Sequence, residues 1–87
     1  MSFFLKVPTA KRKFESRSGR AWEAEIGLYT GTDPQAPRLM VIFRDPRRGE
    51  ADRYTLLAPE APKRPKEAAK ATSDDELRAL LQRSAPL

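Results

Sequence analysis

The sequence contains neither cysteine nor histidine. Without cysteine no disulfide can form, and without either residue a zinc site of the usual cysteine and histidine type is excluded. The commonest general base of enzymes and their thiol nucleophile are also missing. We therefore expect a protein that is not an enzyme and carries no cofactor or metal ion. Nothing in the sequence indicates a small-molecule substrate.

Long apolar runs are missing as well. No stretch approaches the roughly 20 apolar residues that a membrane-spanning helix needs. The apolar residues 3–5 are too few for the core of a signal peptide, and Lys6 interrupts them at once. We therefore expect a cytoplasmic protein that does not bind a membrane.

The chain is short and basic. It has 87 residues, of which 39% are hydrophobic, so a single domain with a thin core is expected. Dimerisation or docking on a larger protein would supplement such a core. The net charge of +5 is concentrated in residues 1–20, and basic proteins are attracted to nucleic acids and acidic surfaces.

Residues 20–30 organise the predicted fold. Trp22, Ala24, Ile26 and Leu28 alternate with a second set of side chains that includes two glutamates. Successive side chains of a strand point to opposite faces, so this pattern predicts a strand with one buried and one solvated face. A helix would instead mix a carboxylate into the apolar stripe.

Three further segments predict strands, at residues 11–17, 38–44 and 50–57. Ser16–Gly19 and Asp45–Gly49 have the composition of tight turns. On alternation, Tyr54 and Leu56 should face the core and Leu57 should face away from it. Residues 38–44 are apolar on both faces, with Met40 and Ile42 on the second face. The fold class is therefore α+β, with an antiparallel β-meander of three to four strands over residues 1–57.

The C-terminal third changes in composition. Prolines recur every three residues at the start of residues 58–72, which predicts a Pro-rich linker. A C-terminal amphipathic helix is predicted over residues 73–84, because Ser73 and Glu76 form a capping box and Leu77, Leu80 and Leu81 fall on one stripe. This helix is too short to be stable alone, so it should pack on the second face of the sheet or on another protein.

Our leading functional hypothesis is a non-enzymatic interaction module that binds a protein partner or forms a homodimer. The binding surface would be the edge of the sheet, the leucine stripe of the helix, or both. In the second case the anchors would be Leu77, Leu80 and Leu81.

The alternative hypothesis is a nucleic-acid-binding protein that contacts phosphates through basic side chains. In a meander the first and third turns lie at the same end of the sheet, and arginines gather there. The candidate residues are Lys11, Arg12, Lys13, Arg17, Arg20, Arg47 and Arg48. A third and more distant hypothesis is acid–base or metal chemistry at Glu23 and Glu25.

Overall fold

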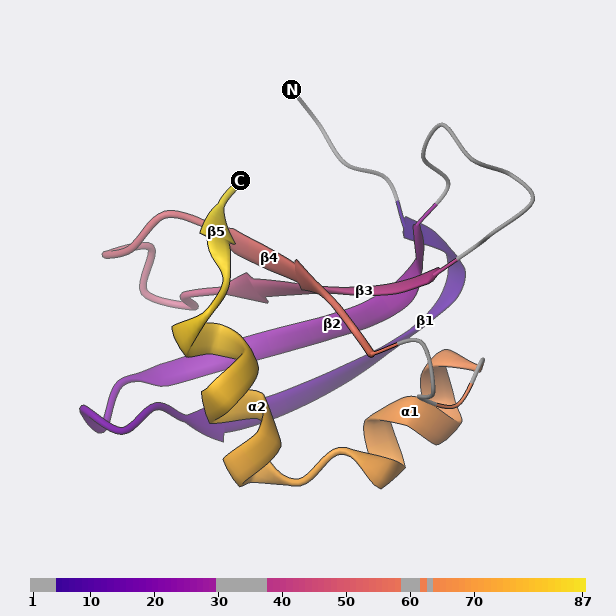
Figure 1. Cartoon of the computed structure of the whole chain (residues 1–87). Helices are drawn as coiled ribbons and strands as arrows, with labels where there is room; N and C mark the ends of the chain where they lie inside the picture. Colours follow the sequence, from indigo (N-terminus) through magenta and orange to yellow (C-terminus); the bar gives the residue numbers. More distant parts are fainter. Residues whose placement is uncertain (1–4, 30–37, 59–61, 63) are drawn as a thin grey trace.

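The computed structural model describes residues 5–29, 38–58, 62 and 64–87, and for residues 5–8 it describes the backbone alone. The sheet has five strands in the order of the chain, and each strand is antiparallel to its neighbours. Two helices lie together below the sheet in Figure 1. The elements are β1 (Leu5–Glu15), β2 (Ala21–Tyr29), β3 (Arg38–Arg44), β4 (Arg53–Leu56), α1 (Pro65–Ala71), α2 (Asp74–Gln82) and β5 (Ala85–Pro86).

One face of the sheet carries the core, as the alternation in residues 20–30 predicted. Phe14 on β1 lies opposite Trp22 on β2, and Ile26 lies opposite Val41 on β3. Each of these side chains is at most 5% exposed. Phe14 also packs edge-on against Phe43, with ring centroids 5.8 Å apart. The predicted α+β fold with an antiparallel meander is therefore confirmed.

The first strand is longer than the predicted segment 11–17. It begins at Leu5 and runs through Pro8, and its pairing with β2 shifts register between Lys6 and Ala10. A proline has no N–H to give to a ladder, so it is accommodated where pairing is interrupted at a sheet edge. The turn that follows β1 agrees with prediction: Gly19 N–H donates to the Ser16 carbonyl, and Gly19 takes a φ of +84°.

The face assignment of β4 was wrong. Met40 pairs with Leu56 and Ile42 pairs with Tyr54, so Tyr54 and Leu56 lie on the second face. Leu57 instead joins the core and donates its N–H to the Leu39 carbonyl. Alternation within β4 could not fix the face because both sets of side chains include a leucine. The register against β3 decides it.

The C-terminal helix begins as predicted but packs elsewhere. Ser73 Oγ accepts the N–H of Glu76 and the Glu76 side chain returns to the Ser73 N–H, which completes the capping box. Leu77 and Leu80 are buried in the core formed with Phe14 and Trp22. The helix therefore covers the tryptophan face, and the interpretation that placed it on the second face was wrong.

Part of the predicted linker is helical. α1 lies within residues 58–72 and buries Ala68 and Ala69 in the core. Its sequence has no wide apolar stripe, but two adjacent small residues suffice for a close approach to the sheet. No helix among the described residues is long and apolar enough to cross a membrane.

A fifth strand closes the far side of the sheet. After α2 the chain returns to pair with β4, with Arg53 opposite Pro86 and Tyr54 opposite Ala85. The predicted meander of three to four strands lacked this short element. A two-residue strand is too short to show a period in the sequence.

Candidate functional site at the open edge of β1

The outer edge of β1 is available for pairing. Ser16 N–H donates to the Arg20 carbonyl and so points toward β2. Because backbone groups of successive strand residues point in opposite directions, those of Lys11 and Lys13 point outward, away from β2. Neither residue's outward N–H or carbonyl has a partner among the described residues. We call these backbone groups of Lys11 and Lys13 the open edge.

Both ends of the open edge are defined. At one end, Arg78 on α2 donates its Nε–H to the outward carbonyl of Glu15 at 2.7 Å. At the other end lies the register shift between Lys6 and Ala10, where Pro8 also lacks an N–H. An added strand would thus find regular backbone only along residues 9–14, which limits it to about six residues, or ~20 Å.

The side chains at the open edge are basic and exposed. Lys11 and Lys13 lie on the second face of the sheet, opposite Glu25 and Glu23 in the register with β2. Neither lysine has a carboxylate within ion-pair distance among the described residues. Their charges are therefore exposed to any segment that lies beside β1.

Glu25 is already occupied by other side chains. It accepts the Thr9 hydroxyl at 2.7 Å and an ion-paired N–H of Arg44. Burial raises the pKa of Glu25, but the hydrogen bonds from Thr9 and Arg44 and the charges of Arg44 and Lys11 outweigh it and leave the pKa below its usual value. Glu25 is thus held in a charged network across three strands, through Thr9 on β1 and Arg44 on β3. Among the described residues there is no cluster of three or more potential metal ligands.

Arg12 has a packing role that the sequence did not indicate. It lies on the core face of β1, where one guanidinium nitrogen donates to the carbonyls of Ala69 and Thr72 and the other pairs with Asp74. These carbonyls lie at the end of α1, so Arg12 joins β1 to both helices. Its position in the alternation, between Ala10 and Phe14, was the available signal that it faces inward.

The predicted cluster of arginines forms only in part. The two turns do meet: Arg20 beside the first turn donates to Asp45 in the third at 2.8 Å, and its other nitrogen lies 3.8 Å from Glu50. Arg44 is paired with Glu25 and lies 3.9 Å from Asp52. Arg17, Arg47 and Arg48 are exposed and form no ion pair within the described ranges.

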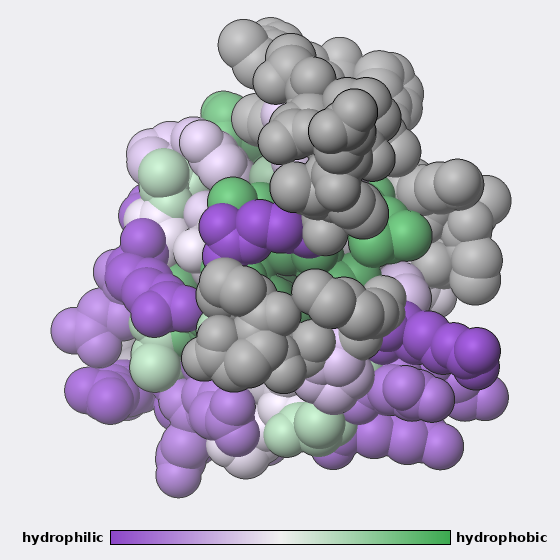
Figure 2. All heavy atoms as spheres, turned by 45° about the vertical axis from the view of Figure 1, so that its right-hand side comes forward, coloured by the Kyte–Doolittle hydropathy of each residue, from purple (hydrophilic) through white to green (hydrophobic). Residues whose placement is uncertain are grey.

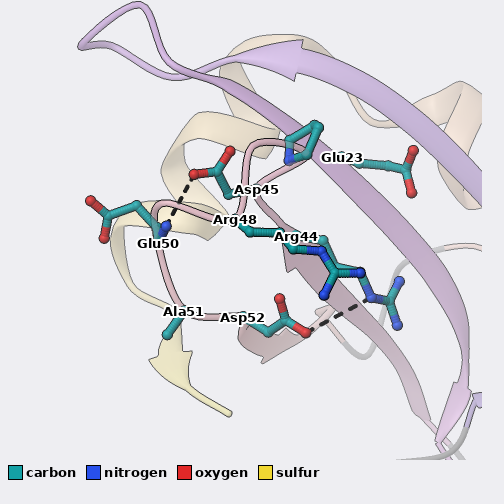
Figure 3. Close-up of a pocket in the computed structure, with 8 residues that line it drawn as sticks. Glu23, Arg44, Asp45, Arg48, Glu50, Ala51 and Asp52 are labelled. Atoms are coloured by element: carbon teal, nitrogen blue, oxygen red, sulfur yellow. Dashed lines mark hydrogen bonds and ion pairs between the residues drawn. The ribbon is translucent and has the colours of Figure 1, made fainter.

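A cavity of about 440 Å³ lies between this third turn and β2. Figure 3 shows Arg44 and Arg48 extending in the same direction there, with the Asp52 carboxylate turned toward Arg44. Four of the lining residues are acidic and two are basic: Glu23, Asp45, Glu50, Asp52, Arg44 and Arg48. Excess carboxylate disfavours a phosphate ligand in this cavity.

Asp45 explains why this turn has its shape. Its buried carboxylate accepts the backbone N–H groups of Arg47, Gly49 and Glu50. The hydrogen bond from Arg47 lowers the pKa of Asp45 most, burial opposes it, and the bonds from Gly49 and Glu50 with the charge of Arg20 complete the lowering. The same wrapping holds Arg48 at a φ of +57°, a region that favours glycine.

The leucine stripe of α2 (Leu77, Leu80 and Leu81) packs mostly inside the hydrophobic core. Leu77 is 0% and Leu80 7% exposed, while Leu81 is partly buried against the same cluster. A partner could therefore reach Leu77 and Leu80 only if α2 left the sheet. In Figure 2 hydrophilic residues dominate the lower left and lower right of the described surface, and the strongly hydrophobic residues show mainly in the middle and at the upper left.

Sequence reasoning also missed the contact that fastens the chain end. Arg53 donates its Nε–H to Ser84 Oγ at 2.8 Å and another N–H to the Ser84 carbonyl. Ser84 Oγ in turn donates to the Leu81 carbonyl, and Leu87 N–H donates to the Asp52 carbonyl. The structure places Arg53 opposite Phe43 on the core face, where a charge needs a partner, but the alternation in the sequence had assigned this position to the other face and so gave no signal of the contact.

Comparisons with models of protein families, with curated proteins and with solved structures found no match for this chain.

Proposed function

We propose that this protein is a small interaction module that binds an extended segment of a protein partner along the open edge of β1. The observation that carries the proposal is the unpartnered, outward-facing backbone of Lys11 and Lys13 in the described chain. An extended peptide adds to such an edge through main-chain hydrogen bonds, and side chains on alternate positions then supply specificity.

The position of β1 in the fold supports this use. β1 pairs along most of its length with β2, and its inner face is fixed to both helices through Phe14 and Arg12. An edge that is already held in strand geometry loses little conformational entropy when a partner adds to it. A rigid template with one free side is what strand addition requires.

Binding through the leucine stripe is the weaker version of the hypothesis. Undocking α2 would remove Leu77 and Leu80 from the core, and a fully buried leucine contributes about 2–5 kcal/mol. A small domain has total stability of only about 5–15 kcal/mol. A partner would have to compensate for most of that loss, whereas the open edge is available without any rearrangement.

A proline substitution tests strand addition directly. The Lys13 N–H points outward, so Lys13→Pro removes a donor from the open edge without removing a hydrogen bond to β2. Lys13→Gln is the matched control, because it removes the same charge and keeps the N–H. Circular dichroism and thermal melting establish whether each variant is folded, and Lys11→Pro is the replacement if Lys13→Pro is not.

The binding probe is a phage-displayed library of random decapeptides selected on the purified protein. We expect enriched peptides whose binding is lost in folded Lys13→Pro and retained in Lys13→Gln, where any decrease is limited to the contribution of the lost charge. Enriched peptides that bind Lys13→Pro as well as the parent would contradict strand addition. Failure to enrich any peptide on the parent protein would contradict it too.

Nucleic-acid binding remains the second candidate, and exposed Arg17, Arg47 and Arg48 favour it. Its test is an anisotropy titration with short single-stranded RNA and duplex DNA at about 50 and 200 mM salt, where a protein that contacts several phosphates loses about a thousandfold in affinity. Removing Arg47 and Arg48 together should then reduce the salt dependence. An unchanged slope would exclude those residues from the contact.

A further inference from the structure

We propose that the segment which pairs with β1 is acidic, with two carboxylates spaced two residues apart that face Lys11 and Lys13. This inference rests on the proposed function and adds the chemistry of the partner. Residues at alternate positions of an added strand lie on the same face as Lys11 and Lys13. Carboxylates placed there would stand beside two exposed ammonium groups that have no ion-pair partner in the described chain.

The opposite face of the open edge offers little to a partner. Phe14 is buried under the helices, and the guanidinium of Arg12 is held by two carbonyls and Asp74. Recognition by side chains must therefore come from the second face. On that face Lys11 and Lys13 are exposed at the open edge, with Thr9 bonded to Glu25 before them and the exposed Glu15 after them.

The neighbouring carboxylates on β2 are not within ion-pair distance of these lysines in the described chain. Glu25 is engaged by Thr9 and Arg44, and Glu23 lies beside the Arg44 end of β3 in the register. The lysines extend from the strand that a partner would touch, while both glutamates are one strand further in. A partner carboxylate would thus meet an ammonium group first.

A second copy of this chain fits the edge poorly. If two copies of β1 pair antiparallel about residue 11, Lys11 lies opposite Lys11. About residue 12, Lys11 lies opposite Lys13, and about residue 13, Lys13 lies opposite Lys13. Like charges directly opposite each other destabilise a pair of strands. The register centred on residue 13 would pair Lys11 with Glu15, but the Glu15 carbonyl is already taken by Arg78.

The test uses synthetic decapeptides with a central run of alternating valine and glutamate. A twin has glutamine in place of glutamate, and a scrambled peptide has the same charge with the two glutamates adjacent. We expect the alternating acidic peptide to bind the parent protein roughly tenfold more tightly than the glutamine twin, because two opposite-charge cross-strand pairs are added. The preference should vanish in the double variant Lys11→Gln/Lys13→Gln.

The outcomes separate this inference from the proposed function. Equal binding of the acidic peptide and the glutamine twin, both lost in Lys13→Pro, would overturn the acidic partner and leave strand addition standing. Equal binding of the scrambled and alternating acidic peptides would overturn the spacing, since charge alone would then explain affinity. Peptide binding unaffected by Lys13→Pro would overturn both, and so would RNA binding that competes with every peptide and survives Lys13→Pro.

Discussion

The two edges of this sheet are finished in different ways. On the β4 side the chain returns after α2, adds the two-residue strand β5, and is fastened where Arg53 contacts Ser84 and Leu87 contacts Asp52. On the β1 side an 11-residue strand ends the sheet, and Arg78 occupies a single carbonyl at Glu15. Figure 1 shows the helices beneath the sheet and the yellow C-terminal segment beside β4.

The difference shows what each edge tolerates. A long edge strand is a template for pairing, and proteins limit unwanted pairing by covering the edge or by placing lysine on it. Here the β4 edge is covered by the chain itself, whereas the β1 edge carries Lys11 and Lys13 and remains uncovered in the described structure. Lysine repels copies of the same edge but attracts an acidic strand, so it selects partners rather than excluding all of them.

The largest expected effect on stability comes from weakening the packing of α2, the helix that leads to β5. We call the β4 side of the sheet, which β5 covers, the closed edge. Leu77→Ala should lower the free energy of unfolding by about 2–5 kcal/mol, because Leu77 is fully buried between α2 and the sheet. Urea unfolding measures the change. Leu81→Ala is the control and should cost less, since Leu81 is only partly buried. Equal losses in the two variants would contradict the packing described for α2.

A smaller loss of stability should follow from replacing Asp45. This residue lies in the β3–β4 turn and forms an ion pair with Arg20, which follows the β1–β2 turn. Asp45→Asn should lower the melting temperature at pH 7, because an amide cannot replace a charged acceptor of four hydrogen bonds.

The stabilisation by Asp45 should depend on pH. The pKa of Asp45 is lowered in the folded protein, so its contribution is present above the unfolded pKa of about 3.9 and is lost as pH falls through the folded pKa. The gap in melting temperature between Asp45→Asn and the parent should therefore shrink below about pH 4. A constant gap down to pH 2 would mean that the carboxylate charge does not stabilise the turn.

Removing the Ser84 hydroxyl should increase local unfolding at β4 and β5. Ser84→Ala deletes the Oγ that accepts from Arg53 and donates to Leu81, and an unsatisfied buried group costs about 1–3 kcal/mol. We expect faster amide exchange at β4, as measured by hydrogen–deuterium exchange, with the exchange of β1 unchanged. Ser18→Ala, in the exposed first turn, should change neither. Uniform acceleration across the sheet would show that the two edges are not independent.

The smallest effect concerns backbone strain in the third turn. Arg48→Gly should stabilise the protein by about 0.5–1 kcal/mol in urea unfolding, because glycine adopts the positive φ of this position without a steric penalty. Arg47→Gly is the matched control: its φ is not positive, so the added freedom of the unfolded chain should destabilise the protein. The same sign for both variants would argue against strain at Arg48.

Much of the fold followed from local sequence signals. The alternation around Trp22, the turn at Ser16–Gly19 and the capping box at Ser73 all appear where local physics placed them, because each depends on residues close in the chain. The open edge of the candidate site could be predicted from the sequence only in part. The Lys11 and Lys13 positions were predicted as basic strand residues, but which edge stays open depends on strand order and on where the C-terminus returns.

The sequence by itself determined that the chain forms a meander with one apolar face, a capped leucine helix and basic residues near the start. Only the tertiary structure decided the face of Tyr54 and Leu56, the docking of α2 on the tryptophan face, and the inward roles of Arg12 and Arg53. The physical reason is range. Periodicity and capping are set within one or two turns of chain. Register and face depend on residues in different strands, and the contacts of Arg12 and Arg53 join residues more than 30 positions apart, so all of them form only when the sheet is complete.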